Sequence, residues 1–123
     1  MHGLDIYTSE VDDKGIDFVA RKGANRYWEV QVKSVYKSKY IYFVKSAFDI
    51  QQANLLVAVV PFVNGEAPTI YLIPAQAWKA PNSLLVSRDF EGKASAAEWG
   101  LQLSRKNIPL LSRYAFELVV GAL

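Results

Sequence analysis

Four residues near the start of the sequence have the types and spacing of a site that binds a divalent metal ion and a phosphate. Glu29, Gln31 and Lys33 alternate with apolar residues, so in a strand all three side chains lie on one face. Asp17 lies on the preceding strand-like segment. Carboxylate and amide oxygens are hard ligands of the kind that Mg²⁺ binds, and a lysine can pair with a phosphate. An ordinary solvated strand face is the competing interpretation, because it tolerates almost any polar residue.

A β-hairpin is expected to bring Asp17 next to the other three residues. Strand-like sequence runs from Ile16 to Arg21 and again from Tyr27 to Val35. The turn between the two runs contains Gly23 and Asn25, residue types that accept the positive φ angles of tight turns. The two runs are therefore predicted to pair as antiparallel strands.

The rest of the chain predicts further strands and one substantial helix. Strands are expected at Leu4 to Thr8, Tyr40 to Val44, Leu55 to Phe62, Thr69 to Ile73 and Leu84 to Val86, with a last edge strand at Trp99 to Leu103. Short helical turns are expected at Ser46 to Gln52 and at Pro74 to Trp78. Asn107 can cap a C-terminal helix whose apolar stripe is Ile108, Leu111, Ala115 and Leu118, with Gly121 as its stop. These elements predict one α+β domain over residues 1–123.

Composition excludes several classes of protein. With 51% hydrophobic and 13% aromatic residues, the 123-residue chain can bury a genuine core. Cysteine is absent and His2 is the single histidine, which excludes disulfide frameworks, thiolate sites and His-based triads. The net charge of +2 does not by itself indicate nucleic acid. No signal peptide or membrane-spanning stretch is visible, so a cytoplasmic protein with no membrane association is expected.

The segment from Gly15 to Val19, followed by Glu29 to Ser34, resembles the PD-(D/E)xK nuclease superfamily. In that superfamily an aspartate at the start of one strand is followed by a (D/E)-x-K tripeptide on the next, as in archaeal Holliday-junction resolvases and many restriction-type endonucleases. Here Gln31 takes the first position of the tripeptide, which is similar to a Q-x-K variant found in some group I intron homing endonucleases and in an uncharacterised bacterial branch. The resemblance is specific over Val11 to Ser34. It implies a restriction-endonuclease-like α+β fold, with a central mixed sheet, flanking helices and a C-terminal helix.

The resemblance also implies a role for each matching residue. Asp17 would be the metal-binding carboxylate, Gln31 a second ligand through its neutral oxygen, and Lys33 the residue that orients water or stabilises charge on the phosphate. The implied cofactor is Mg²⁺ or Mn²⁺. Gln31 lacks the usual negative charge, which weakens metal binding unless another acid compensates; Glu29, Glu10, Asp12 and Asp13 are the candidates. Family members also carry a glutamate on a helix before the first strand, whereas this sequence begins almost directly at the strand expected from Leu4. We expect that the helix is absent, that a partner subunit supplies it, or that it precedes this sequence.

Basic and aromatic residues on either side of the motif are candidates for contacts with DNA. They are Lys37, Lys39 and Tyr36 after the second strand, and Arg21 and Arg26 around the hairpin turn. Lysine and tyrosine together suit phosphate contacts and stacking on unpaired bases. The same mixture suits an exposed strand edge that lysines protect against aggregation, and both interpretations stay open.

The function predicted from these features is metal-dependent hydrolysis of DNA phosphodiester bonds, with DNA as the partner and a homodimer or homo-oligomer as the assembly. A catalytically impaired, DNA-binding relative of such a nuclease is a second form of the same hypothesis. The alternative from another class is a non-enzymatic protein-interaction domain of a bacterial defence or toxin-type system. In that case Glu29, Gln31 and Lys33 would be only the polar face of a sheet.

Overall fold

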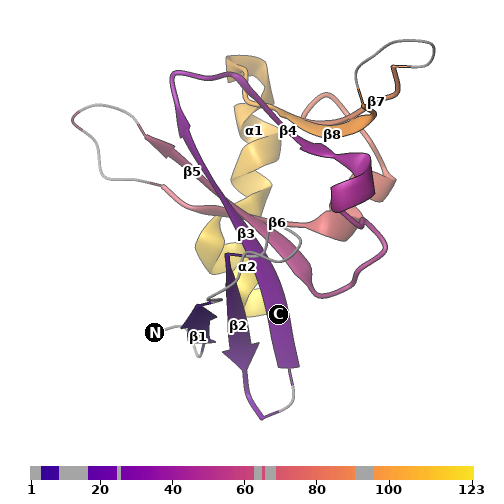
Figure 1. The fold of residues 1–123 in the computed structure, drawn as a ribbon. Helices are drawn as coiled ribbons and strands as arrows, with labels where there is room; N and C mark the ends of the chain where they lie inside the picture. The colour runs from indigo at the N-terminus through magenta and orange to yellow at the C-terminus, as the bar shows by residue number, and fades with distance from the viewer. Residues whose placement is uncertain (1–3, 9–16, 25, 63–64, 66–68, 91–95) are drawn as a thin grey trace.

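Eight strands of the described chain form two sheets of five and three strands (Figure 1). The computed structural model describes residues 4–8, 17–24, 26–62, 65, 69–90 and 96–123. The predicted α+β class and mixed sheet are confirmed. No helix in the described part is both long and apolar enough to cross a membrane.

The larger sheet has the strand order β1-β2-β3-β5-β6. Its strands are β1 (Leu4–Thr8), β2 (Phe18–Lys22), β3 (Arg26–Tyr36), β5 (Leu55–Phe62) and β6 (Tyr71–Pro74). The pairing of β3 with β5 is parallel, and the other pairs are antiparallel. The predicted hairpin is confirmed, with Phe18 opposite Val30. Gly23 has φ 71° in its turn, a conformation that glycine adopts readily.

The smaller sheet consists of β4 (Tyr40–Val44), β7 (Leu85–Arg88) and β8 (Glu98–Gln102), in the order β4-β8-β7. The strand predicted at Trp99 to Leu103 exists, but it is the central strand of this sheet and not an edge. The sequence pattern gave no sign of a separate second sheet, because β4 and β8 pair across the long intervening stretch from residue 45 to residue 97.

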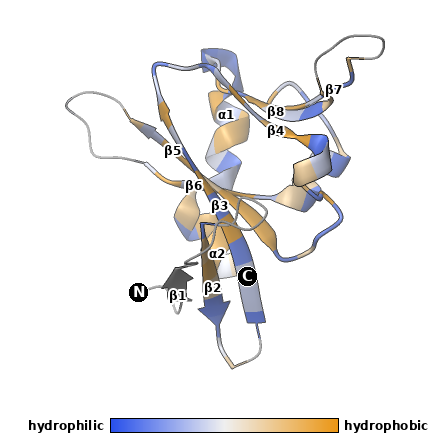
Figure 2. Cartoon of the chain, in the orientation of Figure 1, coloured by the Kyte–Doolittle hydropathy of each residue, from blue (hydrophilic) through white to orange (hydrophobic). Residues whose placement is uncertain are grey.

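The smaller sheet covers one face of the larger sheet, and a helix covers the other (Figures 1 and 2). β5 serves both faces: Leu55, Val57 and Val59 belong to the core shared with the smaller sheet, and Leu56 and Ala58 face the helix. This explains why β5 is an unbroken apolar run. Figure 2 shows hydrophobic residues concentrated on β5 and β6 and hydrophilic ones where β2 ends and β3 begins.

Trp78 is the largest side chain that is fully buried between the two sheets. It belongs to the 3-10 helix η2 (Ala75–Lys79), which follows β6 as expected from the proline before it. Its indole Nε1 donates a hydrogen bond to the carbonyl of Gly100 on β8 at 2.8 Å. Its ring packs edge-to-face against Phe43 and Phe48. Trp78 therefore joins the end of the larger sheet to the middle of the smaller one. The other short helix predicted in this half of the chain is a single 3-10 turn, η1 (Lys45–Ala47).

The C-terminal helix that the spacing predicts is divided into short pieces. They are the 3-10 turn η3 (Arg105–Asn107), α1 (Ile108–Leu111), the 3-10 turn η4 (Ser112–Tyr114) and α2 (Phe116–Ala122). The break lies at Ala115, which is extended (ψ 137°) and forms a β-bridge with Tyr71. The amide of Phe116 donates to the carbonyl of Ile70 at 3.0 Å. Pairing with β6 therefore overrides the helical pattern.

Two polar residues fix the ends of this C-terminal region. Asn107 was predicted to cap the helix, but it makes no capping bond. It is 1% exposed, and its side-chain amide donates to the carbonyls of Ser83 and Gln102 at 2.9 Å. At the other end, Lys22 Nζ donates to the carbonyls of Val120 and Leu123 at 2.9 Å, which ties the end of α2 to β2.

Candidate functional site

Asp17 lies against β3 at the position of Gln31. Its amide donates to the carbonyl of Val30 at 2.9 Å, and its carboxylate Oδ2 accepts from the amide of Val32 at 2.6 Å. The carboxylate thus occupies the place that a backbone carbonyl would take if β2 began earlier. These two bonds bracket Gln31, so Asp17 and Gln31 are neighbours across the strand pair.

Gln31 and Lys33 lie on the same face of β3, separated by two residues or ~6.5–7 Å. Both line a groove between β3 and β4, which also includes Tyr40 and Phe43. The Nζ of Lys33 lies 5.2 Å from the centre of the Phe43 ring, a cation–π distance. The hairpin therefore brings Asp17 and Gln31 together, and Gln31 and Lys33 share one groove.

The polar face of β3 is less exposed to solvent than the polar face of a strand at the protein surface usually is. Gln31 is only 7% exposed, and Val35 on the same face belongs to the core between the two sheets. The opposite face packs as predicted, with Trp28 and Val30 buried near α2. The row from Glu29 to Lys33 is thus a polar strip beneath the rim of the second sheet.

Glu29 lies in the same row but already has a partner. Its Oε2 accepts a hydrogen bond from Gln52 Nε2 at 2.5 Å, and the same nitrogen donates to Asn54 Oδ1 at 2.9 Å. This network joins β3 to the segment before β5. Glu29 therefore has a structural role, and the predicted supporting role at the metal site stays a prediction. Glu10, the other predicted supporting residue, lies outside the described residues.

The basic residues predicted to contact DNA occur at both ends of β3. Arg21 and Arg26 are near the hairpin tip, where Arg21 pairs with Tyr27. Tyr36 ends β3, and Lys37 and Lys39 follow it, all exposed. Ten residue steps at ~3.3 Å put the two ends of β3 about 33 Å apart. The candidate DNA contacts therefore form two groups that flank Gln31 and Lys33, not one patch.

A buried acid that the sequence analysis missed lies on the smaller sheet. Glu98 is 8% exposed and accepts a hydrogen bond from the hydroxyl of Tyr40 at 2.5 Å. Burial of the Tyr40 ring, followed by this bond and the charge of Glu98, raises the pKa of Tyr40 to about 12. The guanidinium of Arg88 lies 4.3 Å from the centre of the same ring. These residues come together through the pairing of β4, β8 and β7.

Gly100 is the one signal in the sequence that indicated this close packing. A glycine inside a strand often marks the close approach of another group. A Cβ atom on Gly100 would lie 2.0 Å from the hydroxyl oxygen of Tyr40. The glycine therefore makes room for the tyrosine to reach Glu98. The partner and the buried acid cannot be deduced from the glycine alone.

The described residues offer few ligands for a metal ion. Asp17 is an exposed carboxylate, and Gln31 beside it contributes an amide. Within the described ranges, no three Asp, Glu or His side chains gather into a metal-binding group. Mg²⁺ accepts such a set, because it usually takes one or two carboxylates from a protein and keeps waters and substrate phosphates as its other ligands.

A comparison with solved structures aligns the chain with Hjc, a Holliday junction resolvase from the archaeal hyperthermophile Archaeoglobus fulgidus. The TM-score is 0.56, with 16% sequence identity over 98% of this chain and 84% of the resolvase chain. No protein-family model matches the sequence, and no curated protein matches it. The structural similarity shows that the chain has a restriction-endonuclease-like fold.

Proposed function

We propose that this protein is a metal-dependent endonuclease that hydrolyses phosphodiester bonds in DNA. One arrangement of residues carries the proposal. The Asp17 carboxylate accepts a hydrogen bond from the Val32 amide, next to Gln31, and Gln31 and Lys33 line one groove. A fold shared with a Holliday junction resolvase supports the proposal. The sequence resemblance of Asp17, Gln31 and Lys33 to the D…Q-x-K nuclease motif is its other support. Membership of the PD-(D/E)xK superfamily, in its Q-x-K variant, is part of the proposal.

Each residue of the motif has a distinct role in this proposal. Asp17 and Gln31 would hold Mg²⁺ or Mn²⁺, which supplies Lewis-acid chemistry at a phosphate when bound. Lys33 pairs with the phosphate that is cut and stabilises the negative charge that develops on it. Its ammonium lies beside the Phe43 ring, in the groove between β3 and β4. The hydrogen bond from Val32 keeps the Asp17 carboxylate in place.

The two basic groups at the ends of β3 suggest how DNA lies on the protein. A span of about 33 Å corresponds to roughly one turn of a DNA duplex. Phosphates near Arg26 and near Lys37 would then position the strand, and the central phosphate would lie at Lys33. Two such chains, as a homodimer, would present one site to each DNA strand.

A DNA-binding protein without nuclease activity is the second candidate. Two observations favour it: Gln31 replaces an acid, and the Glu29 carboxylate is engaged by Gln52. Both reduce the negative charge available to a metal ion. A third hypothesis, a non-enzymatic protein-interaction domain, differs from the nuclease and from the DNA-binding protein because it predicts no binding of DNA.

Cleavage of supercoiled plasmid and of four-way DNA junctions tests the proposal, with Mg²⁺, with Mn²⁺ and with a chelator. Asp17→Asn keeps an oxygen that can accept from the Val32 amide, so it should fold while losing the negative charge. Lys33→Met keeps most of the side-chain volume. We expect each to reduce cleavage by about 10²–10³-fold, the usual effect of removing one charge-stabilising group.

Matched controls exist for both variants. Glu117 is an exposed carboxylate in the first turn of α2 and lines neither pocket that includes Gln31, so Glu117→Gln should cleave at the wild-type rate. Lys79 is exposed on η2, and Lys79→Met should also be neutral. Cleavage that needs no metal, or that survives Asp17→Asn and Lys33→Met, would contradict the nuclease. Salt-sensitive binding without cleavage would support the second candidate.

A further inference from the structure

In the described part of the chain, the strand β4 has a hydrogen-bonded neighbour on one side only, because it is an end strand of the smaller sheet. The amide of Lys45 donates to the carbonyl of Ala97 at 2.9 Å, which extends the pairing of β4 with β8 by one residue. In an antiparallel pair, residues that bond to the partner strand alternate with residues whose N–H and C=O groups point away from it. The N–H groups of Tyr40, Tyr42 and Val44 therefore point away from β8.

This free edge of β4 faces the groove that Gln31 and Lys33 line. All five residues of β4 line the same groove. Successive side chains of a strand point to opposite faces, so side chains alone would bring only alternate residues to one cavity. A cavity that every residue of a strand lines runs along the edge of that strand, where the backbone is exposed. The N–H groups that point away from β8 therefore point toward the groove.

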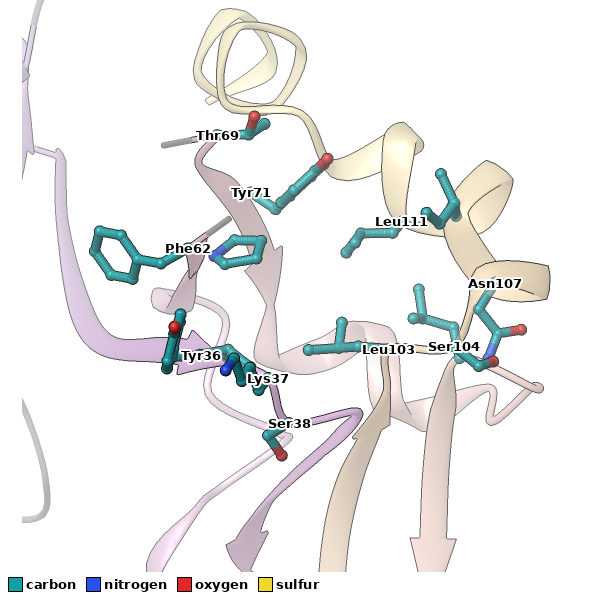
Figure 3. A pocket seen from close by; sticks show the side chains of 14 residues that line it. Tyr36, Lys37, Ser38, Phe62, Thr69, Tyr71, Leu103, Ser104, Asn107 and Leu111 are labelled. Carbon is teal, nitrogen blue, oxygen red and sulfur yellow. The ribbon is translucent and has the colours of Figure 1, made fainter. Parts of the chain in front are cut away.

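Ser38 and the turn after β4 already occupy part of this edge. The hydroxyl of Ser38 donates to the Tyr40 carbonyl at 2.9 Å and accepts from the Tyr40 amide at 3.4 Å. Figure 3 shows Ser38 on the connection from β3 to β4, where it also lines a separate and mainly apolar cavity with Leu103. Val44 is the N-cap of η1, a position whose carbonyl accepts the first bond of the turn. The Val44 N–H and the N–H and C=O of Tyr42 are left without a described partner.

The charge of the groove matches an anion. Lys33 is the one charged side chain among the described residues that line it, and its Nζ lies 5.2 Å from the centre of the Phe43 ring. Phe43 lies between Tyr42 and Val44 in β4, so the ammonium and the two N–H groups share one stretch of the groove. Lysine and backbone N–H groups are the donors that proteins commonly use to contact phosphate oxygens.

We propose that the edge of β4 forms the second side of the phosphate site, and that the Val44 N–H donates to a non-bridging oxygen of the phosphate that Lys33 contacts. This inference rests on the proposed function and adds a backbone donor to it. Because the sheet holds this N–H in position, it needs no rearrangement when negative charge develops on the phosphate during cleavage. The Tyr42 N–H, on the same side of β4, is a second donor for the same DNA strand.

An extended peptide is the other occupant that a free strand edge can accept, since it can add a strand to the sheet. Two observations favour the phosphate. Ser38 and η1 leave the Tyr42 carbonyl as the one described acceptor on this edge, so a peptide strand could form few of its bonds. The ammonium of Lys33 also favours an anion over the neutral backbone of a peptide.

Val44→Pro removes the N–H and retains the backbone conformation. Val44 has φ −65°, the value to which proline is restricted, and its N–H lies outside the pairing with β8, so the variant should fold. In chelator we expect it to bind a labelled DNA duplex about 2- to 10-fold more weakly, the effect of one hydrogen bond. With Mg²⁺, cleavage of supercoiled plasmid should fall about 10- to 100-fold, because hydrogen bonds to a charged group are stronger. Val44→Ala keeps the N–H and should lose less in both assays.

Ser104→Pro is the control for the proline ring itself. Ser104 has φ −79°, also within the range of proline, and it does not line the groove between β3 and β4. This variant should bind and cleave DNA like the wild type. Thermal unfolding of Val44→Pro, Val44→Ala and Ser104→Pro shows whether each variant is folded.

Amide chemical shifts of the wild-type protein give a second test that needs no variant. In chelator, addition of the DNA duplex should move the amide proton of Val44 downfield, because its N–H gains a charged acceptor. The Lys45 amide already donates to the carbonyl of Ala97, so its proton should move less. This measurement decides the inference even where Val44→Pro does not fold.

Three results would contradict the inference. They are a Val44 amide that DNA leaves unshifted, a folded Val44→Pro that binds and cleaves like Val44→Ala, and a loss in Ser104→Pro equal to that in Val44→Pro. A Val44 amide that responds to a peptide of alternating valine and glutamate, but not to DNA, would identify an extended peptide as the occupant.

The proposed function fails separately from this inference. A DNA-dependent shift of the Val44 amide without any cleavage would exclude the nuclease and retain the phosphate contact. Metal-dependent cleavage with an unshifted Val44 amide would exclude the contact and retain the nuclease.

Discussion

The two faces of the five-stranded sheet are built differently. The face toward α2 is a small apolar core of residues such as Trp28, Val30 and Leu56. The face toward the smaller sheet has a larger core around Trp78, and it also carries the polar row from Glu29 to Lys33 along β3. A sheet can cover its face with apolar residues alone, as the first face does. Polar residues retained beneath the rim of a second sheet therefore indicate a use other than solubility.

The largest difference between the faces should appear when Trp78 is removed. We expect Trp78→Ala to lower the free energy of unfolding by about 3–5 kcal/mol. The variant loses a fully buried ring, its edge-to-face contacts and the hydrogen bond to Gly100. Trp28→Ala, on the α2 face, is the matched control and should have a smaller effect. Denaturant unfolding of both measures the difference, and equal losses would contradict the central position of Trp78.

Tyr40→Phe should cost about 1–3 kcal/mol, because it leaves the buried Glu98 carboxylate without its hydroxyl donor. The pKa of Tyr40 is raised from 10 to about 12, so the folded state favours the protonated hydroxyl. Its stabilising contribution is therefore complete below pH 10 and is lost as the pH rises toward 12. Unfolding measured from pH 8 to 12 should show this loss in the wild type and a shallower one in Tyr40→Phe. Parallel pH curves would contradict the assignment.

A substitution of Lys22 tests how firmly the end of α2 is attached to the five-stranded sheet. Lys22→Met removes two hydrogen bonds to the carbonyls of Val120 and Leu123 at the end of α2. We expect a loss of about 1–2 kcal/mol, since the lysine is half-buried and also complements the helix dipole. Amide hydrogen exchange should accelerate in α2 and leave β8 unchanged. Lys106→Met, at an exposed position, serves as the control.

The smallest change in stability is expected for Gln31→Leu. Leucine keeps the apolar burial of this position but removes one polar interaction of the amide, so the free energy of unfolding should fall by about 0.5–1.5 kcal/mol. Cleavage should also fall if Gln31 is the second metal ligand, as we propose. Unchanged cleavage would show that the polar row serves packing only, and the contrast between the two faces would then carry no functional meaning.

The sequence was most informative where local pattern decides the structure. The β5 strand follows from an unbroken apolar run, and the β2–β3 hairpin from two strand-like runs around Gly23. The neighbourhood of Asp17 and Gln31 follows from that hairpin. Local pattern failed where distant segments pair. The bridge between Ala115 and Tyr71 breaks the predicted C-terminal helix, and no helical periodicity encodes a partner 44 residues away.

The site itself was only partly visible in the sequence. Alternation put Gln31 and Lys33 on one face, but it implied solvent where the structure has the rim of a second sheet. Glu98 escaped notice because an isolated acid in a strand has no distinguishing spacing. The positive φ angle of Lys37 (60°) could not be predicted either, because a lysine gives no local indication of positive φ.

The parallel pairing of β3 with β5 bears on how the molecule reaches its native state. Antiparallel neighbours can begin to pair at a short turn. These two parallel strands can pair only after the connecting residues 37–54 have crossed from the end of β3 to the start of β5. Long-range parallel pairing is intrinsically slow. During synthesis the strand that carries Gln31 and Lys33 would therefore gain its second neighbour late, and the groove that both residues line would form only when the sheet is complete.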